Sequence, residues 1–142
     1  NDAFAIGGSK VHNGQNEVAT VVAAGITVHE ALKAQKQLAE TNIGIRVIDC
    51  YSIKPIDATT LKKAAGETKA MIVVEDHYPE GGLGEAVLSA LLVETPLKVP
   101  PCKVVHLAVR KQPRSGSPEE LLDFEDISAR KIVEVVKQLA GK

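Results

Sequence analysis

Apolar and polar residues follow one another along the chain in blocks that predict alternating strands and helices. Residues 71–74 form an unbroken apolar run rich in β-branched side chains, which is typical of a strand covered on both faces. A polar loop follows, in which Pro79 excludes a helix interior and Gly81 and Gly82 permit backbone geometries closed to other residues. From Leu83 the apolar residues recur at helical spacing. The centre of the chain is therefore predicted to be a strand, a loop and a helix.

Two strand-like runs, residues 9–12 and 17–24, lie near the start of the chain. They are separated by Asn13-Gly14-Gln15-Asn16, and Asn-Gly is a strong turn signal, so we expect an antiparallel hairpin. The second run is almost entirely apolar, as expected inside a sheet, whereas Lys10 and His12 indicate an edge strand. The hairpin would add one antiparallel edge strand to the sheet.

Helix starts elsewhere carry capping signals: a capping box at Thr27 and Glu30, an N-cap at Asp57, and a second capping box at Ser117 and Glu120. The other elements expected are a helix ending near residue 42, a strand at 43–50, a helix ending at residue 66, a proline-containing connector at 97–101, a strand at 103–109 and a final helix ending before residue 141. Alternating strands and helices favour parallel pairing through right-handed crossovers. The predicted fold class is α/β, a three-layer α/β/α sandwich around about five mostly parallel strands.

Composition narrows the function classes. With 142 residues the chain fits one domain, and we expect residues 1–8 to be a linker from upstream domains and residues 9–142 to form the domain. A net charge of −1 and 3% aromatic residues disfavour a nucleic-acid partner, and no apolar run reaches the ~18 residues of a membrane span. Cys50 and Cys102 lack metal-ligand spacing, which favours free thiols and a cytoplasmic location.

The loop after the central strand carries the most candidate chemistry. Gly81-Gly-Leu-Gly84 suggests a phosphate-binding loop, but the dinucleotide fingerprint is incomplete and four surrounding carboxylates would repel a phosphate. A tight turn for close helix–sheet packing is the favoured interpretation. His77 with these carboxylates could form a metal or acid–base centre, although Glu75 and Asp76 should point to opposite faces. A hydrogen-bonded loop or a contact surface is favoured, and the other histidines, including His106, are expected to be structural or solvated.

One basic cluster follows the last predicted strand. Arg110, Lys111 and Arg114, with Ser115, could bind an anion through charge-assisted hydrogen bonds. A solvated loop is the favoured alternative. The sequence contains no complete catalytic triad, Gly-x-Ser-x-Gly elbow or His-Glu-x-x-His motif, so no catalytic, cofactor-binding or metal-binding residue is assigned.

The helix from residue 83 has two apolar sides. One stripe should face the sheet, whereas Leu88 and Leu92 lie one turn apart on another side and predict a contact with a second domain or subunit. The competing explanation is coverage by the C-terminal helix through Ile132 or Val136. The candidate interface residues are His77, Tyr78, Gly81, Gly82, Leu88 and Leu92.

Residues 73–87, Val-Val-Glu-Asp-His-Tyr-Pro-Glu-Gly-Gly-Leu-Gly-Glu-Ala-Val, closely resemble the C-terminal domain of transketolases, especially the animal type. Supporting stretches follow in the same order over essentially the whole chain: Phe4-Ala-Ile-Gly7, Ala24-Gly-Ile-Thr-Val-His-Glu-Ala-Leu32, Ile45-Arg-Val-Ile-Asp49, Ile53-Lys-Pro-Ile-Asp57, His106-Leu-Ala-Val109 and Pro113-Arg-Ser-Gly116. Cys50-Tyr-Ser52 and Arg110-Lys-Gln112 depart from the family pattern.

The resemblance implies a parent enzyme that moves a two-carbon ketol unit between sugar phosphates with thiamine diphosphate and Mg or Ca. It implies upstream domains on the same polypeptide that hold most cofactor and substrate groups, and a homodimer that this domain supports. The family's Gly-Asp-Gly diphosphate motif has no counterpart here, so we expect the isolated chain to be inactive. The alternative is a partner-docking domain of a thiamine-dependent 2-oxo acid dehydrogenase subunit. Asp76-His-Tyr78 and Pro113-Arg-Ser-Gly116 favour transketolase.

Overall fold

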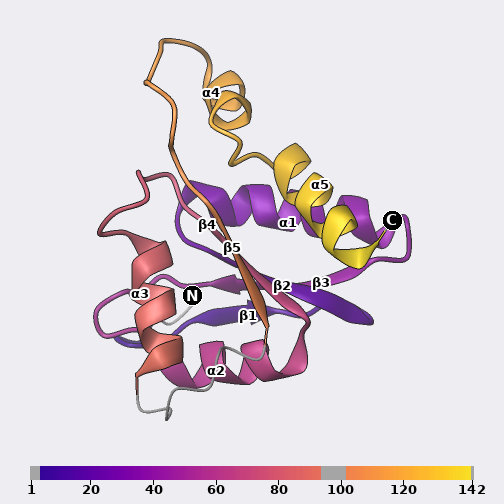
Figure 1. The fold of residues 1–142 in the computed structure, drawn as a ribbon, viewed down its shortest axis with the longest axis vertical. Coiled ribbons are helices and arrows are strands. Elements are labelled where there is room, and N and C mark those ends of the chain that lie inside the picture. The colour runs from indigo at the N-terminus through magenta and orange to yellow at the C-terminus, as the bar shows by residue number, and fades with distance from the viewer. Residues whose placement is uncertain (1–3, 94–101, 142) are drawn as a thin grey trace.

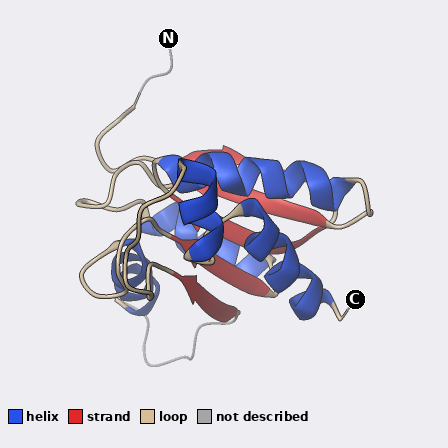
Figure 2. Ribbon diagram, turned by 90° about the horizontal axis from the view of Figure 1, so that it is seen from above, coloured by secondary structure: helices blue, strands red, loops and turns tan. Residues whose placement is uncertain are grey.

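A computed structural model describes residues 4–93 and 102–141. Within these ranges the chain forms a sheet with helices on both faces, which confirms the predicted fold class (Figures 1 and 2). The predicted connector at 97–101 lies outside the described residues. None of the described helices is long and apolar enough to cross a membrane. The elements are β1 (Lys10–His12), β2 (Glu17–Ala23), α1 (Ile26–Ala39), β3 (Gly44–Asp49), α2 (Ala58–Glu67), β4 (Ala70–Val74), α3 (Leu83–Leu92), β5 (Lys103–Leu107), α4 (Pro118–Phe124) and α5 (Ala129–Ala140).

The strand order among the described residues is β1-β3-β2-β4-β5, with β1 antiparallel to β3 and the other pairs parallel. The antiparallel edge strand is confirmed, but the predicted hairpin is wrong because β1 pairs with β3 and not with β2. Both edges of β2 are occupied by the parallel neighbours β3 and β4. The chain from β1 to β2 therefore crosses the start of β3. A side chain at Gly14 or Gly44 would collide there with the backbone of Ile45 or Gln15.

The two faces of the sheet pack against different helices. One core joins β-strand residues such as Ile72 to Leu38 of α1 and Ile132 of α5. The other joins Val73 to α2 and α3, as expected where successive strand residues point to opposite faces. Figure 1 shows α1 and α5 together on one side of the sheet and α2 and α3 on the other. The C-terminal helix therefore cannot cover Leu88, and the competing explanation for that residue is wrong.

Two of the three predicted caps are confirmed. The Asp57 carboxylate accepts the Thr60 N–H at 3.1 Å, and Ser117 and Glu120 form a complete capping box. The capping box at Thr27 and Glu30 is wrong because α1 begins at Ile26 with Gly25 as its N-cap, two residues earlier than predicted, which places Thr27 inside the first turn. The Thr27 hydroxyl instead lies 2.9 Å from the carbonyl oxygens of residues 24 and 74.

Candidate functional site

The carboxyl ends of β4 and β5 bring two loops together at one edge of the sheet. The loop of residues 75–82 leads from β4 to α3, and the loop of residues 108–117 leads from β5 to α4. The N–H of Val109 donates to the carbonyl of His77 at 2.9 Å and joins the loops directly. Ligand sites of open parallel sheets form outside the carboxyl ends of the strands, so the two loops are the first place to look for function.

Glu75 is the centre of this region. This residue follows β4 and is only 4% exposed, and its carboxylate accepts the backbone N–H groups of Leu83 at 2.6 Å and Gly84 at 3.1 Å. On the other side, Nε2 of His106 lies 2.5 Å from the Glu75 carboxylate. These N–H groups have no acceptor within α3, because they lie in its first turn, at the positive end of the helix. The buried carboxylate therefore gains charge-assisted hydrogen bonds from them. Glu75 therefore fills the position that a phosphate would take in a phosphate-binding loop.

The glycines of this loop make room for the Glu75–His106 pair. A Cβ atom at Gly82 would overlap the Glu75 carboxylate, and one at Gly84 would overlap the His106 ring. Gly81 has φ of 74°, a region that glycine adopts at little cost. The glycine-rich motif thus serves close packing between α3 and the sheet, as the favoured interpretation of the sequence holds.

The exposed part of the loop presents an aromatic pair. The rings of His77 and Tyr78 stack with centroids 4.3 Å apart, and Tyr78 is 60% exposed. Tyr78 also lines a surface cavity of about 500 Å³ together with Arg110 and Pro113 from the second loop. Exposed tyrosine and arginine are common at the energetic centres of protein interfaces, so the composition suits a contact surface.

The helix α3 has one buried apolar side and a second, more exposed apolar side, as the sequence predicts. Its buried stripe consists of Leu83, Val87, Ala90 and Leu91. Leu88 is half-buried and Leu92 is 52% exposed. The two leucines are therefore available on the surface of the described chain, whereas their role in an interface remains a prediction.

The basic cluster does not converge on one point. Lys111 lies 2.7 Å from the Asp126 carboxylate, and the hydrogen bond between them lowers the pKa of Asp126. The Arg114 guanidinium stacks 3.8 Å from the centroid of the Phe124 ring. Arg110 and Ser115 are exposed. Lys111 and Arg114 are thus engaged at the end of α4, and anion binding by this loop remains a prediction.

The thiols are buried and unreactive in character. Cys50 and Cys102 are both free, and burial raises the pKa of Cys50 to about 11. A thiol with such a pKa is protonated at neutral pH and is a poor nucleophile. Among the described residues, no group of three or more His, Cys, Asp or Glu side chains is placed to hold a metal ion.

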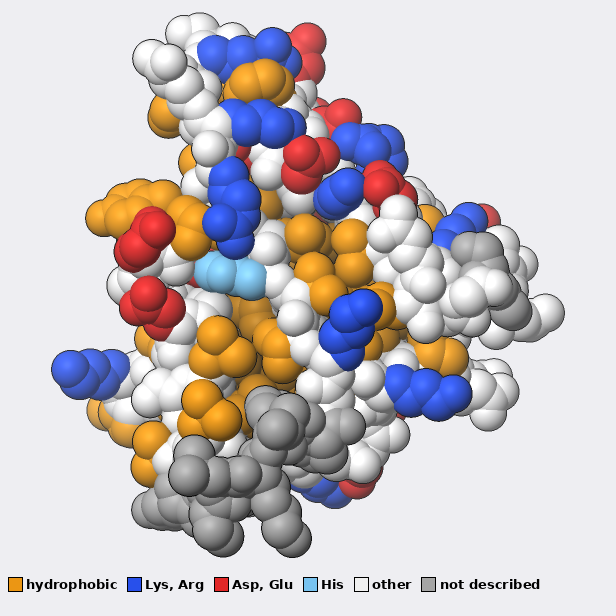
Figure 3. All heavy atoms as spheres, in the orientation of Figure 1, with side chains coloured by type: hydrophobic (Ala, Val, Ile, Leu, Met, Phe, Trp, Pro, Cys, Tyr) orange, Lys and Arg blue, Asp and Glu red, His pale blue; other side chains and the backbone are white. Residues whose placement is uncertain are grey.

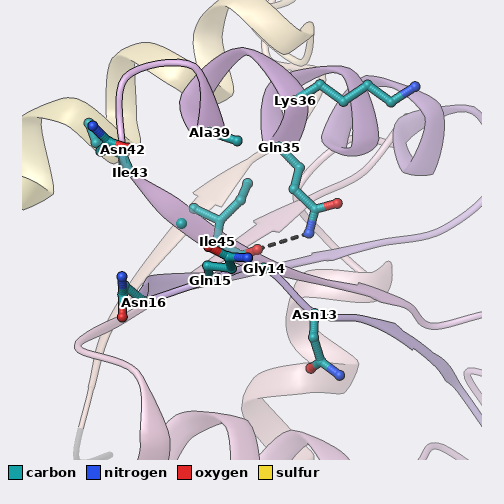
Figure 4. A pocket seen from close by; sticks show the side chains of 11 residues that line it. Asn13, Gly14, Gln15, Asn16, Gln35, Lys36, Ala39, Asn42, Ile43 and Ile45 are labelled. Atoms are coloured by element: carbon teal, nitrogen blue, oxygen red, sulfur yellow. Dashed lines mark hydrogen bonds between the residues drawn. The ribbon is translucent and has the colours of Figure 1, made fainter.

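A second cavity, of about 450 Å³, lies beside the loop that crosses the start of β3 (Figure 4). The Gln35 side chain reaches from α1 toward β3, where its amide donates to the carbonyl of Ile45 at 2.9 Å. Asn13, Asn16 and Lys36 point outward in different directions. The cavity therefore presents no converging set of polar groups.

Comparisons with known proteins cover nearly the whole chain. The sequence profile of the family described as "Transketolase, C-terminal domain" matches residues 7–132. The chain is 44% identical to the transketolase of Homo sapiens over 100% of its length and 22% of that protein. It is 46% identical to transketolase-like protein 1 of Bos taurus over 99% of its length and 23% of that protein. The chain thus spans about a fifth of these relatives.

Two solved structures are similar in fold. A split-gene transketolase, an inactive beta4 tetramer, has a TM-score of 0.82 and 34% identity over 96% of this chain and 43% of that chain. A 2-oxoglutarate:ferredoxin oxidoreductase from Magnetococcus marinus has a TM-score of 0.66 and 14% identity over 93% of this chain and 19% of that chain. The second likeness concerns the fold alone.

Proposed function

Because the chain belongs to the family of transketolase C-terminal domains, we propose that it forms the dimer-supporting C-terminal domain of a transketolase. The match over residues 7–132, with 44% identity to human transketolase along the full chain, carries this proposal. The parent enzyme would transfer a two-carbon ketol unit between sugar phosphates of the pentose phosphate pathway. We place it in the cytoplasm, which agrees with the free thiols of Cys50 and Cys102.

The chemistry of the parent enzyme is assigned to domains upstream of this one. Thiamine diphosphate with Mg or Ca needs groups that hold a diphosphate and a divalent cation. The described residues do not fit that group, because the buried Glu75 carboxylate occupies the N–H groups at the start of α3 and would repel a diphosphate. This chain would contribute packing surfaces, not reacting groups.

The contact surface assigned to this role is the candidate interface from the sequence. His77 and Tyr78 form its exposed loop, Gly81 and Gly82 shape that loop, and Leu88 and Leu92 extend it along α3. The partners would be the upstream domains of the same polypeptide and a second subunit. The beta4 assembly of the similar split-gene transketolase supports self-association in this family. The alternative, a partner-docking domain of a thiamine-dependent 2-oxo acid dehydrogenase subunit, gains no support from the 14% identical oxidoreductase, whose likeness concerns the fold alone.

The proposal is tested in the full-length parent protein. We expect the intact polypeptide to sediment as a dimer with transketolase activity that requires thiamine diphosphate and a divalent cation. Removal of this domain should weaken the dimer and reduce activity. A truncated polypeptide with the same activity and the same dimer dissociation constant would contradict the supporting role. An intact polypeptide without ketol transfer would contradict the transketolase assignment.

A further inference from the structure

The strand β5 lies at one edge of the sheet within the described residues, and its hydrogen bonds to β4 alternate along the chain. The N–H groups of Lys103 and Val109 donate toward β4 and its loop, and the carbonyl of Leu107 accepts from that side. In a parallel ladder the residues between them direct their N–H and C=O groups the other way. The backbone groups of Val104 and His106 therefore face outward, and no described residue hydrogen-bonds to them.

Apolar side chains flank this open edge on both faces of the sheet. Val104 packs half-buried on the side of α3, and Val105 packs half-buried on the side of α5. Leu88 of α3 is also half-buried. Figure 3 shows hydrophobic side chains across the middle of this face. Ala108 is only 3% exposed, so the accessible part of the edge ends before it. An accessible edge with apolar flanks is a template for pairing with another strand.

We propose that β5 pairs in an antiparallel manner with β5 of a second copy of this chain, so that two sheets join into one. With the two-fold axis at Val105, Val104 lies opposite His106 of the second copy, and His106 lies opposite its Val104. Each pair exchanges two main-chain hydrogen bonds, which gives about four in total. This inference rests on the proposed dimer-supporting role and names the contact that would provide it.

The edge fits a second copy because its register is self-complementary. The same two-fold axis places Lys103 opposite Leu107 of the second copy, so this pairing puts no positive charge directly across from another. A contact that uses the same patch on both molecules closes as a dimer and leaves no open filament. It also places Leu88 of each copy on the same side of the joined sheet.

A proline at position 104 tests the pairing selectively. Val104→Pro removes an outward N–H group and leaves the bonds between β4 and β5 intact, because proline is tolerated on an edge strand whose N–H faces solvent. Val104→Thr keeps the N–H group and the shape, and serves as the matched control. Sedimentation over a range of concentrations should show a dimer for the unsubstituted chain. We expect the dissociation constant to rise about tenfold or more for the proline variant, since the dimer loses a hydrogen bond from each copy, and to change little for the threonine variant.

Amide hydrogen exchange on the unsubstituted chain gives an independent measurement if the proline variant does not fold. The amides of Val104 and His106 should become protected as concentration rises, whereas the amide of Val105, which faces β4, should be protected throughout. A chain that stays monomeric at millimolar concentration overturns the inference, as does a folded proline variant that associates like the unsubstituted chain. If the full-length enzyme nevertheless needs this domain to dimerise, the proposed function stands and only the β5 contact fails.

Discussion

Glu75 and Glu30 are buried glutamates that each accept backbone N–H groups from a helix to which they do not belong. Glu75 caps the start of α3, and Glu30 of α1 accepts the N–H of Ala129 in α5 at 2.8 Å. Each carboxylate lies at the positive end of its helix, where a negative charge is stabilised. Glu75 therefore connects α3 to the end of β4, and Glu30 connects α5 to α1.

Alanine substitutions at Gly82 and Gly66 should change stability in opposite directions, because the space around the two glycines differs. Gly82→Ala should destabilise the fold by about 1–3 kcal/mol, because the new methyl group displaces a buried charged cap. Gly66→Ala, inside α2, meets no atom within 4 Å and should stabilise it by about 0.5–1 kcal/mol. Urea unfolding of the two variants measures both changes. Equal effects of the two substitutions would show that the Glu75 site is not constrained.

The N-cap at Asp57 predicts a pH dependence. Burial tends to raise the pKa of Asp57, but hydrogen bonds from Thr60 and Ser9 outweigh it and hold the pKa below its usual value. The carboxylate therefore contributes stability that is present above the unfolded pKa, near 4, and is lost as pH falls through the lower folded pKa. Asp57→Ala should cost about 1 kcal/mol at pH 7 and progressively less below about pH 4.

Thermal unfolding at several pH values measures this difference. Asp57→Asn keeps an acceptor oxygen without the charge, so it should lose little stability and show no such pH dependence. A cost of Asp57→Ala that stays constant down to pH 2 would show that the charge of the carboxylate is unimportant.

The two kinds of cap show what local sequence can predict. The Asp57 and Ser117 caps were predictable because the donor and the acceptor lie within three residues of each other. The contact of Glu75 with His106 joins residues 31 positions apart and depends on the register of β4 with β5. Only a sheet model with Val73 beside His106 would have revealed it.

At the scale of elements, periodicity and capping signals together predicted every strand and helix in the described ranges, but the Asn-Gly turn signal predicted one wrong strand pairing. The Asn13-Gly14 signal favours a hairpin, yet β2 is apolar along nearly its whole length and already needs two neighbours. In the fold β3 and β4 are these two neighbours, so β1 pairs with the outer edge of β3. The resulting crossing depends on long-range contact between Gly44 and Gln15, which no local pattern contains.

The helix α3 predicts different results for two leucines. Leu88→Lys should weaken self-association or domain docking and cost the isolated chain about 1 kcal/mol or less, because Leu88 is only half-buried. Leu91→Lys, in the buried stripe, should cost more than about 2 kcal/mol because it places a charge in the core. Sedimentation and urea unfolding of both variants separate the two effects. Loss of more than about 2 kcal/mol for Leu88→Lys with unchanged association would assign that leucine to the core.

At the scale of the whole molecule, the described chain has two cores, one on each face of the sheet. Its exposed loop, the two α3 leucines and the open β5 edge are the surfaces that we propose for contacts with other protein. The chain spans about a fifth of the length of its curated relatives. The proposed function divides the labour between this domain, which would support an assembly, and further domains, which would hold cofactor and substrate.

This division predicts that the 142-residue chain neither binds thiamine diphosphate nor transfers a ketol unit. The start of α3 is the place in the described fold that most resembles an anion site, and the Glu75 carboxylate occupies its N–H groups. Calorimetric titration with thiamine diphosphate and magnesium should show no saturable heat at micromolar concentrations, while the full-length parent enzyme serves as the positive control. Glu75→Gln removes the charge and should not create a site, because no metal ligands accompany it among the described residues. Saturable micromolar binding by the unsubstituted chain would place cofactor groups in this domain and overturn the division.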